Sequence, residues 1–181
     1  MPRPFVLGLL ALCCAAPAAE AQPAAPTPGA LRQAIQQKGA EAVLMEVYED
    51  DARWQQVLEG IASGSPGWLT VGERLKRVAR EQAEELTVAV ARALEKQPAH
   101  ALAVLGEAFD ADDVCSLNTL EQSLGPDYNA ALRAVERRQK AVAAVRDPRL
   151  QAQRDECLAF LQELGREVVR NKTTWFQTTS R

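Results

Sequence analysis

Helical periodicity interrupted by proline is the feature that most limits how this chain can fold. Four prolines downstream of the N-terminal region each open a stretch of apolar residues with helical spacing: Pro66, Pro98, Pro126 and Pro148. Proline is tolerated in the first turn of a helix because the N–H that it lacks would have no partner there. Ser65 and Asp147 precede two of these prolines and are good N-cap residues. The pattern predicts a succession of helices.

Glycine delimits the first expected helices. Residues 30–38 and 40–48 have helical apolar spacing on either side of Gly39, which predicts two short helices or one bent helix. The next helix is predicted by residues that follow the i, i+3, i+4, i+7 rule: Trp54, Val57, Leu58 and Ile61. The segment ASGSPG at 62–67 then predicts a turn.

The middle of the chain has fewer glycine and proline residues to mark where helices end. Residues 66–96 contain two apolar stripes, and we expect the helix to break near Arg80. Leu102 and Leu105 are assigned to a short helix that ends at Gly106. These boundaries are expectations from spacing alone.

The C-terminal half has the clearest pattern, with two long apolar stripes joined by the short connection RDP at 146–148. The first stripe consists of Tyr128, Leu132, Val135, Val142 and Val145. The second consists of Leu150, Cys157, Leu161, Leu164 and Val168. Because the connection is short, the two helices are expected to form an antiparallel helical hairpin.

These stretches together predict an all-α single domain over residues 30–170. Segments 54–75 and 84–106 each have the pattern of an antiparallel helix pair, and such pairs stack in α-solenoids. Two units without a shared consensus leave a helical bundle equally open. Aromatic residues make up only 5% of the chain, so we expect close, Ala-mediated packing around five aromatic anchors: Trp54, Trp68, Phe109, Tyr128 and Phe160.

The N-terminus has the pattern of an export signal. A basic start, an apolar run and small residues predict a signal peptide over 1–21 that is cleaved after Ala21. Residues 22–29 form a Pro/Ala-rich linker that is expected to be extended or disordered. Cys13 and Cys14 leave a lipoprotein as one alternative, and an uncleaved N-terminal helix is a second alternative for this segment.

The mature chain is therefore expected outside the cytoplasm, either periplasmic or secreted, in a Gram-negative bacterium. Beyond the signal, charges interrupt every apolar stretch, so no integral membrane segment is expected after cleavage. The net charge is −3 and basic residues are not massed in one patch. Nucleic-acid binding therefore has no electrostatic support.

Cleavage leaves two cysteines, Cys115 and Cys157, and in an exported protein these are expected to form a disulfide. A cysteine protease needs a nearby histidine, and the chain has only His100. A zinc site needs more Cys and His ligands than these three residues. We therefore expect no metal and no cofactor.

The aspartates before Cys115 invite a test as a calcium loop. Asp110, Asp112 and Glu121 fall at template positions 1, 3 and 12, but Val114 and Cys115 occupy positions that require a ligand and a glycine. The match fails at both. Asp110 is instead expected to cap a helix whose first turn carries acidic residues.

No catalytic motif is present in the sequence. The segment IASGS lacks the G-x-S-x-G spacing, and SGSPG lacks the lysine and spacing of a P-loop. Adjacent acidic residues such as Glu84 and Glu85 point in different directions on a helix. A lone His100 is more often structural than catalytic. The sequence favours a non-catalytic protein.

Two features suggest surfaces for a partner. The basic segments are RLKRVAR and RAVERRQK, and we interpret both as solvated helix faces. The second segment includes Arg138, and its Arg133 and Arg137 are candidate contacts for an acidic partner. Trp175 and Phe176 lie in the polar tail at 171–181 and are expected either to fold back onto the core or to bind a partner.

The sequence therefore favours an exported, non-catalytic helical protein of the bacterial envelope that binds another protein, with an inhibitor or immunity protein as one subtype. One alternative is a cell-wall or glycan hydrolase with carboxylates that converge from different helices. Another is a carrier of a small apolar ligand bound between helices.

Overall fold

The structure, a computed structural model, describes residues 25–115 and 128–170. Within these ranges the regular secondary structure is helical, apart from one isolated bridge between Leu105 and Phe109. The elements are α1 (Pro28–Lys38), α2 (Ala40–Tyr48), α3 (Asp51–Ala62), α4 (Pro66–Lys76), α5 (Ala83–Lys96), α6 (Pro98–Leu102), α7 (Ala111–Cys115), α9 (Tyr128–Ala143), the 3-10 turn η1 (Pro148–Leu150) and α10 (Gln151–Arg170). The predicted all-α class is confirmed.

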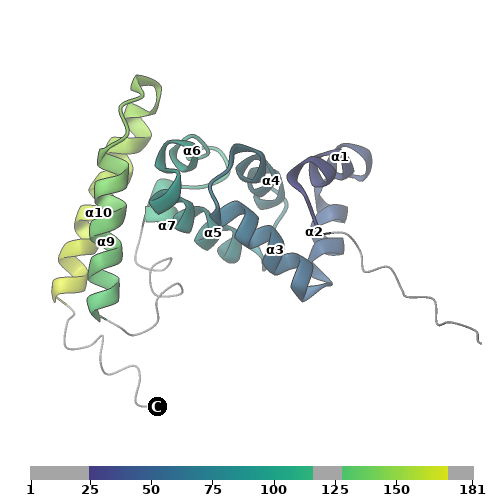
Figure 1. The fold of residues 1–181 in the computed structure, drawn as a ribbon, viewed down its shortest axis with the longest axis horizontal. Helices are drawn as coiled ribbons and strands as arrows, with labels where there is room; N and C mark the ends of the chain where they lie inside the picture. The colour runs from purple at the N-terminus through teal and green to yellow at the C-terminus, as the bar shows by residue number, and fades with distance from the viewer. Residues whose placement is uncertain (1–24, 116–127, 171–181) are drawn as a thin grey trace, which may run out of the picture.

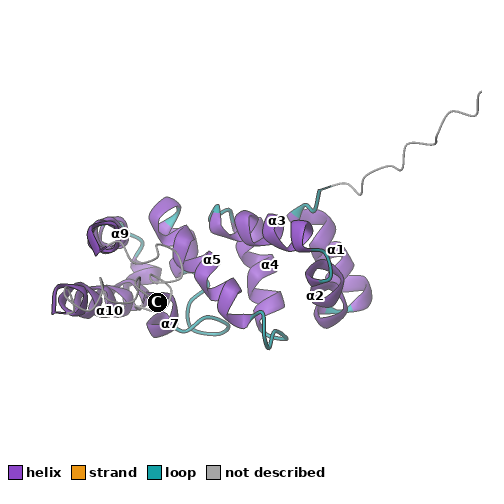
Figure 2. Ribbon diagram, turned by 90° about the horizontal axis from the view of Figure 1, so that it is seen from below, coloured by secondary structure: helices purple, strands orange, loops and turns teal. Residues whose placement is uncertain are grey.

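The helices form an elongated row (Figure 1). α1 and α2 lie at one end, α3 to α6 form the middle, and the hairpin of α9 and α10 closes the other end, as the perpendicular view also shows (Figure 2). Several helices pack on partners that are not adjacent in the chain: α3 packs chiefly on α5, α7 packs chiefly on α10, and α4 contacts α1 as well as α3. α5 contacts α3, α4, α6, α7 and α9, and the hairpin is joined to the other helices through α5, α6 and α7.

The first two helices confirm the break at Gly39. Gly39 has a φ of +89°, a conformation that L side chains rarely adopt, so the helix ends there and restarts at Ala40. α1 begins at Pro28, two residues earlier than the spacing predicted. The cause is local, because the Thr27 hydroxyl accepts a hydrogen bond from the N–H of Ala30 and proline suits the first helical position.

α3 and α4 are held together by glycines that allow close approach. A Cβ built on Gly60 would lie 2.4 Å from the Trp68 ring, and one built on Gly72 would lie 3.1 Å from Ile61. The two contacts are reciprocal, since each helix supplies one glycine and one large side chain. Trp68 is half-buried here, on the face of α4 that packs against α3.

The predicted break near Arg80 is confirmed, because α4 ends at Lys76 and α5 begins at Ala83. Lys76 joins the two helices: its Nζ donates to the carbonyl of Ala83 at 3.0 Å and to the Thr87 hydroxyl at 2.8 Å. The same ammonium group lies 5.7 Å from the centre of the Phe109 ring. This is within cation–π range, so one cation links α4, α5 and the segment before α7.

α6 is shorter than predicted. It ends at Leu102, and Leu105 lies in the turn beyond it rather than in the helix. Gly106 has a φ of +112° and its N–H donates to the carbonyl of Phe109 at 2.9 Å. This closed turn, which glycine permits, replaces the last turn of the expected helix.

The core runs the length of the row and includes Trp54, Phe109 and Tyr128 as predicted. Phe160 was also expected to be a core anchor, and that expectation is wrong: it is 36% exposed. Phe160 lies at the edge of the buried seam of α10, so part of the residue is exposed to solvent. Within the described ranges, no helix has both the length and the apolar composition required to cross a membrane.

Candidate binding groove

The C-terminal hairpin turns at Asp147. The Asp147 carboxylate accepts one hydrogen bond from the backbone N–H of Arg149 at 3.0 Å and another from the Arg149 guanidinium at 2.7 Å. These bonds to Arg149 hold the pKa of Asp147 below its ordinary value. As the sequence predicted, Asp147 is the N-cap of the turn that leads into α10, and α9 and α10 pack along each other.

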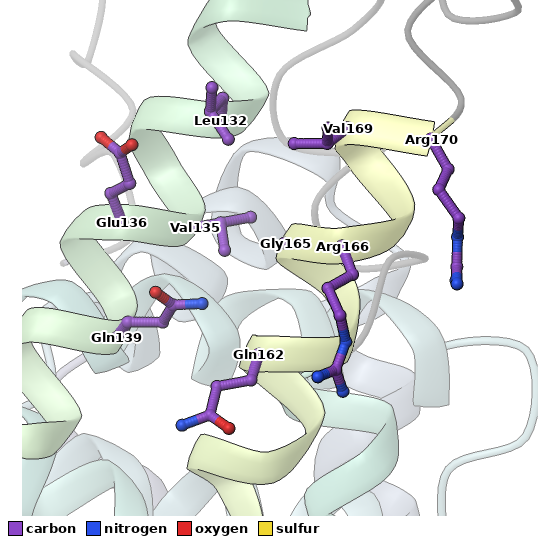
Figure 3. A pocket seen from close by; sticks show the side chains of 9 residues that line it. All are labelled: Leu132, Val135, Glu136, Gln139, Gln162, Gly165, Arg166, Val169 and Arg170. Carbon is purple, nitrogen blue, oxygen red and sulfur yellow. The ribbon is translucent and has the colours of Figure 1, made fainter.

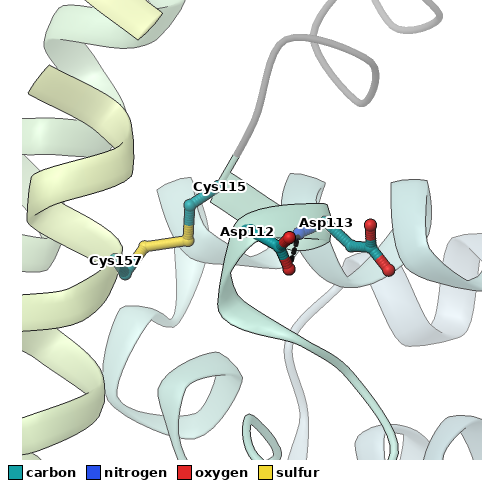
Figure 4. Close-up of a disulfide and its surroundings, with 4 residues drawn as sticks. All are labelled: Asp112, Asp113, Cys115 and Cys157. Atoms are coloured by element: carbon teal, nitrogen blue, oxygen red, sulfur yellow. Dashed lines mark hydrogen bonds between the residues drawn. A yellow bond between two sulfur atoms is a disulfide. The ribbon is translucent and has the colours of Figure 1, made fainter. Parts of the chain in front are cut away.

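A disulfide joins α7 to this hairpin. Cys115 at the end of α7 is bonded to Cys157 on α10, with their Cα atoms 5.6 Å apart (Figure 4). Both cysteines are fully buried. The predicted pairing is confirmed, and its position on the seam of α10 makes it a structural crosslink rather than a reactive thiol site.

A buried cation joins the hairpin to α5. Arg138 is only 1% exposed, and its Nε donates to a carboxylate oxygen of Glu95 at 3.4 Å. The second oxygen of Glu95 accepts from Arg137 Nε at 2.8 Å. Burial lowers the pKa of Arg138, and its Nη1 has no hydrogen-bond partner. The interpretation of Arg138 as part of a solvated face is therefore wrong.

Gly165 lets the two long helices come close at their open ends. A Cβ on Gly165 would lie 3.3 Å from the Gln139 amide nitrogen and 3.5 Å from a methyl group of Val135. Gln139 uses that nitrogen to donate to the carbonyl of Leu161 at 2.7 Å. The backbone of α10 is therefore exposed to α9 at this point, and the helices enclose a shallow space beside it.

That space is a groove, here called the hairpin groove, with a volume of about 720 Å3 and open to solvent. Val169 points from α10 toward α9 and Val135 points from α9 toward α10, whereas Glu136 points away (Figure 3). The residues that line it are Leu132, Val135, Glu136, Gln139, Gln162, Gly165, Arg166, Val169 and Arg170. The groove thus has apolar walls and a polar rim.

Val169 is the unusual member of the groove. It is 55% exposed, although it is a large apolar residue on an ordered helix. Val135 opposite is buried, and Leu132 is half-buried. Single exposed apolar residues are common, but this one continues an apolar surface formed by two helices.

Two arginines of the rim, Arg166 and Arg170, share one carboxylate, that of Glu163. Glu163 accepts from Arg166 Nε at 2.9 Å and from Arg170 Nη2 at 2.8 Å. Hydrogen bonds from Arg166 first, and then from Arg170, hold the pKa of Glu163 below its ordinary value of 4.5. Both guanidinium groups are therefore bound to Glu163, which does not itself line the groove, while Glu163 is ionised.

The structure separates the residues that the sequence singled out for binding. Arg133 and Arg137 are both exposed on α9. Arg137 is occupied by its ion pair with Glu95, so it contributes to the attachment of α9 to α5. Trp175 and Phe176 lie outside the described residues. The groove itself was missed, although two of its lining residues, Leu132 and Val135, belong to a predicted apolar stripe, and Val169 lies beside the predicted seam residue Val168.

The remaining candidates for chemistry lie elsewhere. Asp110, Asp112 and Asp113 place carboxylate oxygens within 4.8 Å of one another, and all three residues are exposed. Asp112 and Asp113 are on the side of α7 that faces away from α10 (Figure 4). His100 is exposed, with a ring nitrogen 3.2 Å from the carbonyl of Gly64. Neither group adjoins the hairpin groove.

Comparison with protein-family models, with curated proteins and with solved structures finds no match to this chain. The groove, its rim and the buried crosslink are therefore the observations on which a function can be argued.

Proposed function

We propose that this chain is an exported, non-catalytic helical protein that binds another protein through the hairpin groove. The observation that carries the proposal is the exposed Val169 on the wall of a groove whose opposite wall is also apolar. An inhibitor or immunity protein is a subtype of this function.

The composition of the groove suits a protein partner. Protein interfaces combine an apolar centre with a polar rim, and arginine is enriched in them. In the hairpin groove the centre is Val135 and Val169, while Arg166 and Gln162 lie on the rim. An extended or helical segment of a partner could place apolar side chains between α9 and α10 and hydrogen-bond with the rim.

The alternatives receive less support. Sites for small apolar ligands bury most of the ligand, whereas this groove is open along one side. A hydrolase with paired carboxylates needs one acid and one base in different environments. Asp110, Asp112 and Asp113 share one environment, since all three are exposed to water.

The compartment belongs to the proposal. A pair of buried, bonded cysteines fits an oxidising space such as the bacterial periplasm, and residues 1–21 have the pattern of an export signal. Expression of the full chain in a Gram-negative host, followed by fractionation and mass measurement, tests this point. We expect a periplasmic product that begins at Gln22 and resists thiol alkylation without reduction; a full-length cytoplasmic product would contradict it.

The binding function is tested by site-specific photo-crosslinking from position 162 on the rim. We expect a discrete crosslinked protein with the otherwise native chain, and loss of that product in a Val169→Asp variant, because a charge would lie on the apolar wall.

Phe160→Asp is the matched control. It also replaces an exposed apolar residue of α10 with aspartate, but Phe160 does not line the groove. The proposal fails if no product forms, or if both variants lose it equally.

A further inference from the structure

We infer that residues 171–181 are an occupant of the hairpin groove, with Trp175 and Phe176 bound between α9 and α10 of their own chain. The groove and this segment are adjacent in the chain, because Arg170 is both the last residue of α10 and a lining residue of the groove.

The distances allow the contact. Trp175 is five residues beyond Arg170, and an extended chain spans about 3.3–3.6 Å per residue, or about 17 Å. Along α10 the groove runs from Gln162 to Arg170, and eight residues of helix rise about 12 Å at 1.5 Å each. A reversal of the chain after Arg170 therefore brings Trp175 over any point of the groove.

The chemistry also matches. Trp175 and Phe176 are the two large apolar residues of a segment that is otherwise polar, NKTTWFQTTSR. The wall at Val169 offers them apolar surface that is otherwise in water. The alkyl stems of Arg166 and Arg170 add further apolar surface at the rim, while their guanidinium groups are bonded to Glu163.

The size is suitable as well. The groove has a volume of about 720 Å3 and is open along one side, which suits a shallow contact with two aromatic side chains rather than an enclosed ligand. The covalent link raises the local concentration of the segment to the millimolar range that is usual for short linkers. Even a weak contact would then be well populated.

The inference and the proposed function concern the same groove, and each has its own test. The occupancy itself does not depend on any partner, and it is measured on the chain alone.

The test is the fluorescence of Trp175 in the full mature chain, obtained as the difference between the native protein and a Trp175→Ala variant. Trp54 and Trp68 are present in both proteins, so their emission cancels in the difference. We expect the Trp175 emission to be shifted to the blue and its quenching by iodide to be severalfold weaker than that of a tryptophan amide in the same buffer.

Groove variants then locate the contact. Val169→Asp should shift the Trp175 emission to the red and increase its iodide quenching severalfold, whereas Phe160→Asp should leave both unchanged. Val169→Ser is the milder replacement if the aspartate variant loses its helical circular dichroism.

Three results would overturn the inference. The first is a Trp175 that is quenched as freely as the amide in the native chain. The second is an equal response to Val169→Asp and Phe160→Asp. The third is shielding that disappears on dilution, which would place the segment in the groove of a second copy. Failure of photo-crosslinking to a partner would leave these measurements intact, so the two proposals fail separately.

Discussion

Helices α1–α6, here called the row, and the hairpin of α9 and α10 both bring helices close at glycines, but they differ in the other contacts that hold them. In the row, helices approach through glycine against a large side chain, as at Gly60 and Trp68, and ion pairs are confined to the surface. The hairpin is held to the rest by a buried disulfide and by the buried Arg138, with Glu95 as its partner.

This difference shows where the molecule retains surface for other contacts. The row buries its apolar side chains between its own helices, with Met45 as its one strongly exposed large apolar residue among those described. The hairpin is anchored on one side by the crosslink and the ion pair, and it leaves Val169 and Phe160 exposed on α10. A covalent anchor thus adds to the apolar contacts of a two-helix element at one end of the molecule.

Removal of the disulfide should cause the largest loss of stability. It should also remove the contact that distinguishes the hairpin from the row. For Cys115→Ala with Cys157→Ala, the chain-entropy relation for a separation of 42 residues predicts a loss of about 4 kcal/mol in unfolding free energy. Urea titration measures the loss. Hydrogen exchange should show that protection falls in α9 and α10 before it falls in α3 and α5.

The control for this prediction is reduction. Dithiothreitol in the urea titration should destabilise the native chain by a similar amount and should not affect the double variant. Equal loss of protection in α3, α5, α9 and α10 would show that the row and the hairpin are one cooperative unit.

A methyl group on Gly60 tests the packing of the row. Gly60→Ala would place a Cβ 2.4 Å from the Trp68 ring, and overpacking of this kind costs about 1–3 kcal/mol. Gly29→Ala is the matched control in α1, where no atom lies within 4 Å of the new Cβ. It should be neutral or stabilising by less than about 1 kcal/mol. Thermal unfolding measures both, and a neutral Gly60→Ala would contradict the close approach.

Acid should produce the smallest change in stability, and it tests the ion pairs at the rim of the groove. Because the pKa of Glu163 is lowered in the folded chain, its ion pairs stabilise above the ordinary value of 4.5 and are lost as the pH falls through the lowered value. An NMR titration of the Glu163 carboxyl should give a midpoint below 4.5. Arg166→Gln with Arg170→Gln should return it toward 4.5, and an unchanged midpoint would contradict the assigned cause.

The sequence was sufficient for the helices because their signals are local. The period of the apolar residues, the proline at Pro66 and the glycine at Gly39 act within a few residues, and the structure has the expected elements there. The cysteine pairing could also be predicted, since only two cysteines remained to be joined. Elements such as α6 were misjudged where a closed turn at Gly106 competed with one more helical turn.

The site could not be predicted because it depends on contacts between helices. Arg138 falls between Val135 and Val142 on the buried face of α9, but its charge indicated solvent, and its partner Glu95 is on another helix. The hairpin groove depends on the approach of α9 to Gly165, and no local pattern encodes that distance. Phe160 shows the reverse error, since a large aromatic residue indicated burial and the edge of the seam left it exposed.

Burial of both sulfur atoms also dictates when the crosslink can be made. Neither Cys115 nor Cys157 is accessible in the folded molecule, so an oxidase or a small disulfide could not reach them once α10 has docked. Oxidation must therefore precede the last stage of folding. Cys115 is synthesised first and has to remain reduced while the next 42 residues, the whole of α9 among them, become available. Production in a host whose oxidant arrives late should yield a folded but uncrosslinked population that oxidises only as fast as the hairpin opens.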